Sequence, residues 1–238
     1  RYTHPETRYA LQELTADVIQ PLGPSLLQVP GARADVAFLE SFTSAMFASR
    51  GTYGWGGSWG GDAYHVLLYA RLQPEIIYEE TIMKNGLDGF RVLVMADCDV
   101  LPEPVAERVL AFQQAGGIIV GDERLCPAIR PDIVLSVYER TKQADVDKQA
   151  LLERAQLLRE QLGDRYRPYV DSTQAEALPY RRAFGSSDYL FAINDRREFG
   201  QYVGHHGLVM ENGLPISAEF TVNRAAGFVY DLLEHRQV

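Results

Sequence analysis

Hydrophobic positions over the first 135 residues follow two alternating patterns. Short continuous apolar runs indicate strands buried on both faces, and apolar residues three and four apart indicate helices that bury one face. The predicted strands are 34–41, 74–80, 90–97 and 117–123; the helices are 63–72 and 102–115, with a short helix or turn at 81–89. This alternation predicts a flavodoxin-like α/β domain over 34–135, a parallel sheet with helices on both faces.

The pattern before and after this region is different. Apolar residues at near-helical spacing predict a helix over 5–20, and the proline- and glycine-rich segment 21–31 predicts its end. Leu151, Leu158 and Leu162 lie on one face of a long amphipathic helix predicted at 140–162. Segment 165–180 is expected to be irregular. From 188 a period near two predicts antiparallel strands at 188–195, 216–222 and 227–238.

These patterns divide the chain into four parts. The predicted parts are a lead-in helix and linker (1–30), an α/β domain (31–138), an amphipathic helix and connector (139–187) and a partial antiparallel β domain (188–238). The chain begins without a methionine, and both ends look cut, so we expect a piece of a longer protein. The sequence therefore does not predict the cellular compartment of the protein.

The bulk composition excludes several classes of function. The chain has 23 basic and 32 acidic residues, a net charge of −9, which argues against a nucleic-acid-binding surface. No apolar run approaches the ~18 residues of a membrane span. Two cysteines are too few for a disulfide framework or a cysteine-based zinc site, and the sequence leaves open whether Cys98 and Cys126 pair.

Cys98 is the first candidate for chemistry, because it follows a predicted strand and precedes a helix. A nucleophile elbow needs small residues on both sides of the nucleophile. Here Asp97 and Asp99 flank the thiol, and two carboxylates raise the pKa of a thiol and lower its thiolate fraction. The sequence therefore favours a strand-end cysteine without catalysis.

The loop "YGWGGSWGGD" (53–62) is the second candidate. It lies between the first strand and the next helix, where open α/β sheets bind ligands. We expect that a saccharide could stack on aromatic rings and form hydrogen bonds with neighbouring polar groups. The candidate binding residues are Tyr53, Trp55, Trp59, Asp62 and His65. The simpler alternative, which the sequence favours, is a long loop whose tryptophans pack on a neighbouring domain or subunit.

Other polar residues carry weaker signals. His205 and His206 are neighbours that would point to opposite faces of a strand, so no metal site is expected. Asn194 and Asp195 are typical of a turn. Acidic residues lie near the ends of several predicted strands and could pair for glycoside hydrolysis, although acidic strand ends are common. They are Glu79, Glu80, Asp97, Asp99, Asp122 and Glu123. No catalytic residue and no cofactor is predicted.

The block 90–123, with its helix ending in "FQQAGG" and followed by a strand, resembles a known family. It is similar to the glutamine amidotransferase-like domain, often called the trimerisation domain, of TIM-barrel β-galactosidases. Segments 11–32 and 32–41 resemble the lead-in helix and first strand of that domain. "DYLFAIND" and "GFVYDLLEHRQV" resemble parts of the C-terminal β domain of those enzymes.

The resemblance implies a fold and a set of partners. It implies that the barrel with the two catalytic carboxylates of those enzymes lies outside this chain, so no catalytic residue carries over. The G-x-C-x-G motif of the glutaminase is absent. The leading hypothesis is a non-catalytic structural or oligomerisation module of a larger, carbohydrate-active protein. Its partners would be other domains of that protein and copies of itself. The alternatives are a saccharide-binding module using loop 53–62 and, least favoured, a Cys98-dependent hydrolase or amidase.

Overall fold

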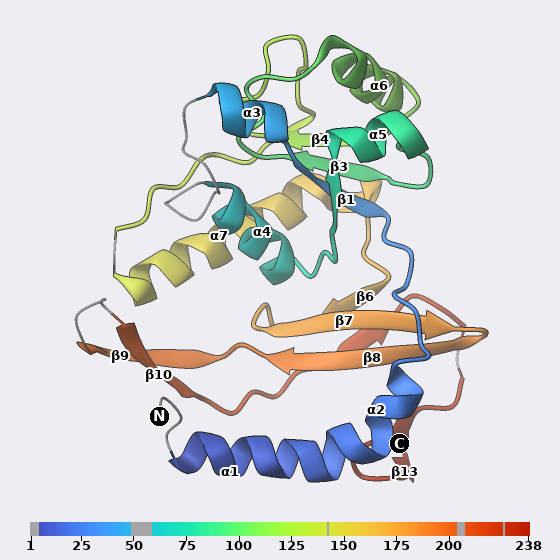
Figure 1. Ribbon diagram of the computed structural model, residues 1–238, viewed down its shortest axis with the longest axis vertical. Coiled ribbons are helices and arrows are strands. Elements are labelled where there is room, and N and C mark those ends of the chain that lie inside the picture. The colour runs from blue at the N-terminus through green and yellow to red at the C-terminus, as the bar shows by residue number, and fades with distance from the viewer. Residues whose placement is uncertain (1–4, 49–58, 142, 204–207, 226) are drawn as a thin grey trace. The chain divides into compact units, whose positions relative to one another are not determined.

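A computed structural model describes residues 5–48, 59–141, 143–203, 208–225 and 227–238 (Figure 1). The chain forms two compact units. The first comprises Arg1–Ala32, Arg181–Phe191 and Asn223–Val238, and the second comprises Arg33–Tyr180 and Ala192–Val222. The domain boundaries predicted from the sequence stay predictions. None of the helices in the described ranges is long and apolar enough to cross a membrane.

The second unit contains a five-stranded, all-parallel sheet. Its strands are β1 (Val36–Glu40), β2 (Glu75–Tyr78), β3 (Val92–Met95), β4 (Ile118–Gly121) and β5 (Ile133–Val134). They lie in the order β2-β1-β3-β4-β5, which is the flavodoxin-like order. The flavodoxin-like α/β fold predicted from the sequence is confirmed. The short fifth strand was not predicted, because two residues give no measurable period.

Helices cover both faces of this sheet (Figure 1). They are α3 (Phe42–Phe47), α4 (Trp59–Tyr69), α5 (Glu79–Asn85), α6 (Glu103–Gln114) and α7 (Ala144–Leu162), which continues into a 3₁₀ turn, η2 (Gly163–Arg165). Along β1, Phe38 faces one core with α4 and α7, whereas Leu39 faces the other with α5 and α6. Alternate residues of each strand thus supply separate cores, which explains why the strands are apolar throughout.

The leucine stripe of the predicted helix at 140–162 is buried. Leu151, Leu158 and Leu162 lie in the same core as β1 and β3, and α7 packs against α4. The helix begins at Ala144, four residues later than predicted. Conversely, α4 begins at Trp59 rather than at 63, so its first turn uses residues of the predicted loop 53–62.

The first helix does not end where the sequence predicts. α1 (Pro5–Leu14) passes through a π-helical turn (Thr15–Ile19) into α2 (Gln20–Leu26). The N–H of Gln20 donates to the carbonyl of Thr15, five residues back. Pro21, which has no N–H to donate, lies just after the π-helical turn; prolines and π-helical turns are the usual places where the helical hydrogen-bond pattern is interrupted.

The remaining strands form small two-stranded sheets. The pairs are β6 (Val170–Ser172) with β11 (Phe220–Val222), β7 (Ala177–Phe184) with β8 (Ser187–Asn194), β9 (Arg197–Val203) with β10 (Leu208–Gly213), and β12 (Tyr230–Asp231) with β13 (Arg236–Gln237). The antiparallel region predicted from 188 is confirmed, but the irregular segment predicted at 165–180 is wrong, because it contains β6 and the start of β7. Pro179 obscured β7; a two-stranded sheet has only edge strands, where proline is tolerated.

Candidate functional site at the carboxyl edge of the sheet

The carboxyl ends of β1, β3 and β4 meet at one edge of the parallel sheet. Ligands of open α/β sheets bind outside this edge, where neighbouring strands send their connections to opposite faces, here between β1 and β3. Several residues considered from the sequence come soon after these strands: Asp97, Cys98 and Asp99 after β3, and Asp122 and Glu123 after β4. We call this region the carboxyl edge.

Cys98 is fully buried just behind the carboxyl edge. Its Sγ lies 3.5 Å from the carbonyl oxygen of Ala96 and 3.8 Å from that of Leu39, within the core that α6 covers. Burial raises the pKa of the thiol well above its usual value, and the charges of Asp122 and Asp97 raise it further. Cys98 is a free thiol, as is the partly buried Cys126, so the two do not pair. Cys98 therefore has neither the ionisation nor the access that a nucleophile needs.

Asp97 and Asp122 form a hydrogen-bonded cluster with Arg124. Oδ2 of Asp122 accepts from the backbone N–H of Asp97 at 2.7 Å, and Arg124 donates to Oδ1 of Asp97 at 2.7 Å. The backbone N–H of Arg124 donates to Oδ1 of Asp122. Burial raises the pKa of Asp122, more than its hydrogen bonds lower it. Both carboxylates thus have partners within their own chain.

The carboxylate of Asp97 also lies at the N-terminus of α4. The backbone N–H of Gly60 donates to Oδ2 of Asp97 at 3.2 Å. The N-terminus of a helix at this edge is where α/β proteins commonly bind an anionic ligand. Here a carboxylate of the protein takes that position, held by a backbone in the left-handed region (φ +56° at Asp97) that aspartate tolerates better than most residues.

Glu79 forms the second polar cluster of the carboxyl edge. Its carboxylate accepts from Ser41 Oγ at 2.7 Å and from Thr43 Oγ1 at 2.9 Å, and the backbone N–H of Thr43 lies 3.3 Å from both oxygens. Ser44 Oγ donates to the carbonyl of Val100. Glu79 is buried, and its bonds fasten the end of β2 to the start of α3. Its oxygens are therefore engaged in structural contacts.

The structure places three of the five predicted binding residues; Tyr53 and Trp55 lie outside the described residues. Trp59 is 2% exposed and belongs to the core beneath α4. Asp62 is buried, and Nε of Arg140 donates to both its carboxylate oxygens at 3.0 Å. His65 is exposed. The described candidates thus share one helix but do not face one common cavity.

Sequence reasoning missed a buried polar cluster in the same unit. Lys148 lies 2.6 Å from the carboxylate of Glu176 and donates to the carbonyl of Asp195 at 2.7 Å. Tyr69 donates to Asp195 at 2.9 Å, and Arg197 lies 3.5 Å from that carboxylate. A signal was present: Lys148 precedes Leu151 by three positions and so falls on the apolar stripe of α7. The cluster joins α4 and α7 to the β segment that begins at residue 192.

Metal-binding chemistry finds no support among the described residues. They contain no group of three or more histidine, cysteine, aspartate or glutamate side chains that could coordinate an ion. His205 and His206 lie outside the described residues.

Comparisons with known proteins identify the fold. No family model matches the chain, and no curated protein matches it. Among solved structures, a β-galactosidase from Bacillus circulans sp. alkalophilus is 14% identical, with a TM-score of 0.59, over 99% of this chain and 43% of that one. A catalytic mutant of Gan42B, a GH42 β-galactosidase from G. stearothermophilus, is 13% identical, with a TM-score of 0.54, over 98% and 40%. An α-L-fucosidase isoenzyme 2 from Paenibacillus thiaminolyticus is 13% identical, with a TM-score of 0.50, over 84% and 45%.

The resemblance to β-galactosidases stated from the sequence is confirmed at the level of the fold. The chain spans less than half the length of each of these solved structures.

Proposed function

We propose that this chain is a non-catalytic structural and oligomerisation module of a larger, carbohydrate-active protein. The observation that carries the proposal is the internal hydrogen bonding of the described polar side chains at the carboxyl edge. The hydrogen bonds of Asp97, Asp122 and Glu79 are made within the chain, and the thiol of Cys98 is buried. A site for turnover needs a nucleophile, a base and space for a substrate at one place. The described residues of this edge do not assemble that set.

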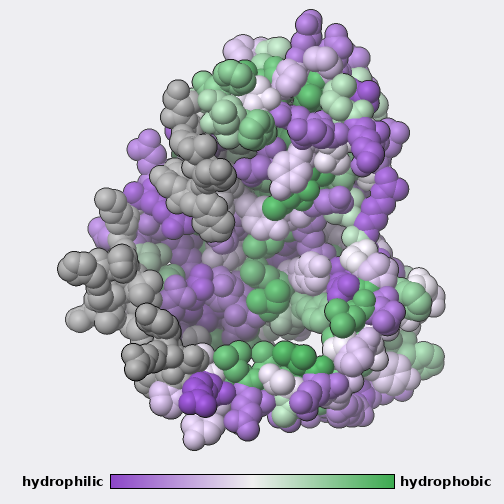
Figure 2. Space-filling model, viewed as in Figure 1, coloured by the Kyte–Doolittle hydropathy of each residue, from purple (hydrophilic) through white to green (hydrophobic). Residues whose placement is uncertain are grey.

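Exposed apolar side chains support a role in assembly. On α3, Phe42, Met46 and Phe47 are 62%, 53% and 73% exposed, and Figure 2 shows apolar surface where α3 lies. In the first unit, α1 buries no residue, and its Tyr9 is 68% exposed. Contiguous exposed apolar surface is unusual on a free monomer and marks surfaces that bind other proteins or domains.

The carbohydrate-active parent is inferred from fold. The solved structures with this fold are named as β-galactosidases and an α-L-fucosidase, and each is more than twice as long as the part that matches. Fold alone does not fix function, so the assignment is an analogy.

Sedimentation velocity tests the oligomerisation role. We expect the chain to self-associate between about 1 and 100 µM, because mass action favours oligomers as concentration rises. The variant Phe42→Ser/Phe47→Ser should shift this transition to higher concentration. Leu157→Ser, which removes an exposed apolar side chain (56% exposed) from α7, is the control and should leave it unchanged. A chain that stays monomeric at about 100 µM contradicts the oligomerisation role.

Saccharide binding by loop 53–62 remains an alternative. Titrating the chain with oligosaccharides while following tryptophan fluorescence tests it, since saturable quenching would support binding. Trp55→Phe should abolish the quenching if the loop binds. The buried Trp59 gives the background signal that persists in this variant. The third alternative, a Cys98-dependent hydrolase, is disfavoured by the burial of the thiol.

A further inference from the structure

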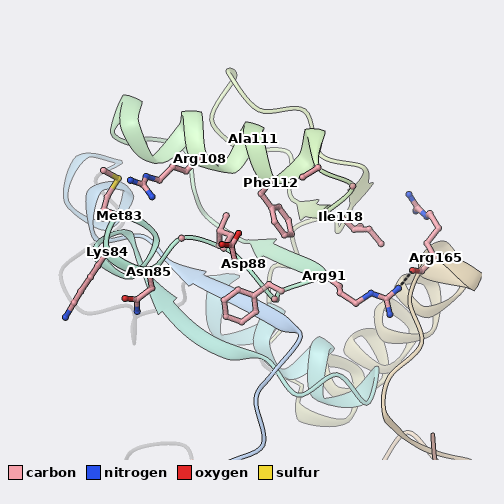
Figure 3. Close-up of a pocket in the computed structure, with 17 residues that line it drawn as sticks. Met83, Lys84, Asn85, Asp88, Arg91, Arg108, Ala111, Phe112, Ile118 and Arg165 are labelled. Carbon is pink, nitrogen blue, oxygen red and sulfur yellow. Dashed lines mark hydrogen bonds between the residues drawn. The ribbon is translucent and has the colours of Figure 1, made fainter. Parts of the chain in front are cut away.

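A basin of about 730 Å³ lies at the opposite, amino edge of the sheet (Figure 3). Its wall comprises the end of α5, the turn 86–91 that leads into β3, the second half of α6 and Arg165 in η2. All of these segments belong to one unit. The volume falls within the range of small-molecule sites, about 300–1,000 Å³.

The basin gathers positive charge on an acidic protein. Its lining includes Lys84, Arg91, Arg108 and Arg165 but one carboxylate, Asp88. In the part of the chain that the structure describes, none of these four cations has a carboxylate within 4.0 Å. Elsewhere arginines form ion pairs, as the Arg140–Asp62 and Arg71–Asp171 pairs illustrate. Grouped cations repel one another, so this arrangement favours an added anion.

Neutral groups position the guanidinium groups. Arg91 donates to the carbonyl of Arg165 at 2.9 Å, and its guanidinium lies 5.3 Å from the ring centroid of Tyr166. Tyr166 is buried and donates to Asp35 at 2.8 Å. Arg165 donates to the carbonyl of Gln161 at 2.9 Å. These contacts orient Arg91 and Arg165 without neutralising them, and a guanidinium has five N–H donors.

Helix polarity explains part of this charge. Lys84 lies in the last turn of α5, and Arg165 follows the end of α7, where cations stabilise the carbonyl end of a helix. Arg108 lies in the middle of α6, and Arg91 lies in the turn before β3, so helix polarity does not account for either. Arg108 donates to the carbonyl of Ile82 at 3.4 Å and Arg91 to that of Arg165, and each guanidinium keeps further N–H donors for a ligand.

The rest of the lining fits a ring with hydroxyl groups. In Figure 3 the ring of Phe112 lies between Arg108 and Arg91. Gly117 lets this ring pack directly on the backbone, because a Cβ there would come within 2.3 Å of the ring. At the helix ends beside the basin, the carbonyls of Ile82, Ala111 and Phe112 already accept backbone N–H groups, so recognition of hydroxyl groups falls to the N–H donors of the arginines.

We propose that this basin binds a small anionic saccharide, in which a carboxylate or phosphate group pairs with a guanidinium group on one side of Phe112 while the sugar ring packs against Phe112. Sugar acids and sugar phosphates share this chemistry. The proposal is independent of the oligomerisation role, because it concerns a different edge of the sheet.

Isothermal titration with glucuronate, glucose 6-phosphate, glucose and inorganic phosphate tests it. We expect saturable binding of at least one charged sugar and about tenfold weaker binding of both glucose and phosphate. Comparing glucuronate with glucose 6-phosphate distinguishes a carboxylate from a phosphate ligand. Equal affinity for phosphate and glucose 6-phosphate, with no binding of glucuronate, would show an anion site without sugar recognition and overturn the proposal. So would no binding of either charged sugar at about 10 mM.

Single variants locate the site. Arg91→Gln and Arg108→Gln should each raise the dissociation constant about tenfold or more, because a charge-assisted contact is lost. Arg130→Gln makes the same change of charge at an exposed residue outside the basin and is the matched control. Circular dichroism verifies that each variant is folded. If Arg91→Gln and Arg108→Gln both bind the saccharide like the original chain, the saccharide lies elsewhere and the assignment to this basin is wrong.

Discussion

The backbone N–H of Gly60, at the start of α4, lies 3.2 Å from Oδ2 of Asp97, which follows β3. A residue at the end of one strand thereby caps the helix that leads away from the neighbouring strand. Arg124, after β4, pairs with the other oxygen of the same carboxylate at 2.7 Å. One side chain thus links three segments at the position where related architectures place ligands.

Replacing Asp97 by asparagine tests this link. Asparagine also tolerates the left-handed backbone, so the variant removes the charge with little change of conformational strain. We expect the free energy of unfolding to fall by about 1–2 kcal/mol, because the helix cap and the ion pair both weaken. Urea denaturation measures it. Asp164→Asn, at an exposed ion pair with Arg167, is the control and should change stability by less than about 0.5 kcal/mol.

Lys148→Met tests the buried polar cluster. The substitution preserves an unbranched side chain but leaves Glu176 and Asp195 without the cation between them. Removing one partner of a buried ion pair is strongly destabilising, and because both carboxylates are partly exposed we expect a loss of about 2–4 kcal/mol. Gln149→Met, at the exposed neighbouring position of α7, controls for helix propensity. Equal stability of the two variants would show that the cluster adds little.

Asp171 should make the stability of the fold depend on pH. Partial burial raises its pKa, but hydrogen bonds from Arg71, the N–H of Ser172 and Arg159 outweigh this effect, and the pKa is lowered overall. The folded chain therefore keeps Asp171 charged at pH values where the unfolded chain protonates it. Its stabilisation is fully present above the unfolded pKa of about 3.9 and is lost as the pH falls through the lower folded value.

The melting temperatures of the original chain and Asp171→Asn measure this dependence. The difference between them should be constant from about pH 7 to 5 and should shrink as the pH falls below about 4. If the difference in melting temperature stays constant below about pH 4 as well, the carboxylate charge of Asp171 does not contribute to the stability of the fold.

How far the sequence predicted the fold depended on the length of each pattern. The leucines of α7 and the strands around Phe38 and Val94 were predicted, because burial imposes a period that several residues repeat. The continuation past Pro21 was not, because a π-helical turn leaves no sequence period. β6 is three residues long and includes Asp171 and Ser172, so its pairing with β11 depends on tertiary contacts.

The candidate site was harder to predict than the fold. The sequence attributed a raised pKa of Cys98 to its flanking aspartates, whereas in the structure burial raises this pKa most, and Asp97 is the flanking residue that contributes. Which acidic residues would form clusters was not predictable, because Asp97, Asp122 and Gly60 come from three separate segments. The basin at the amino edge gave no sequence signal, since its arginines are spread between residues 91 and 165.

Alkylation of Cys98 tests most directly whether the carboxyl edge offers an accessible nucleophile. In a Cys126→Ser variant, Cys98 is the one thiol, and the rate of its reaction with iodoacetamide at pH 7.5 can be followed by mass spectrometry. Because the thiol is fully buried, we predict that it reacts through opening of the fold, at least ~100-fold more slowly in buffer than in urea. A rate in buffer equal to or above that of the unfolded chain would show an accessible, activated thiol and contradict the non-catalytic account.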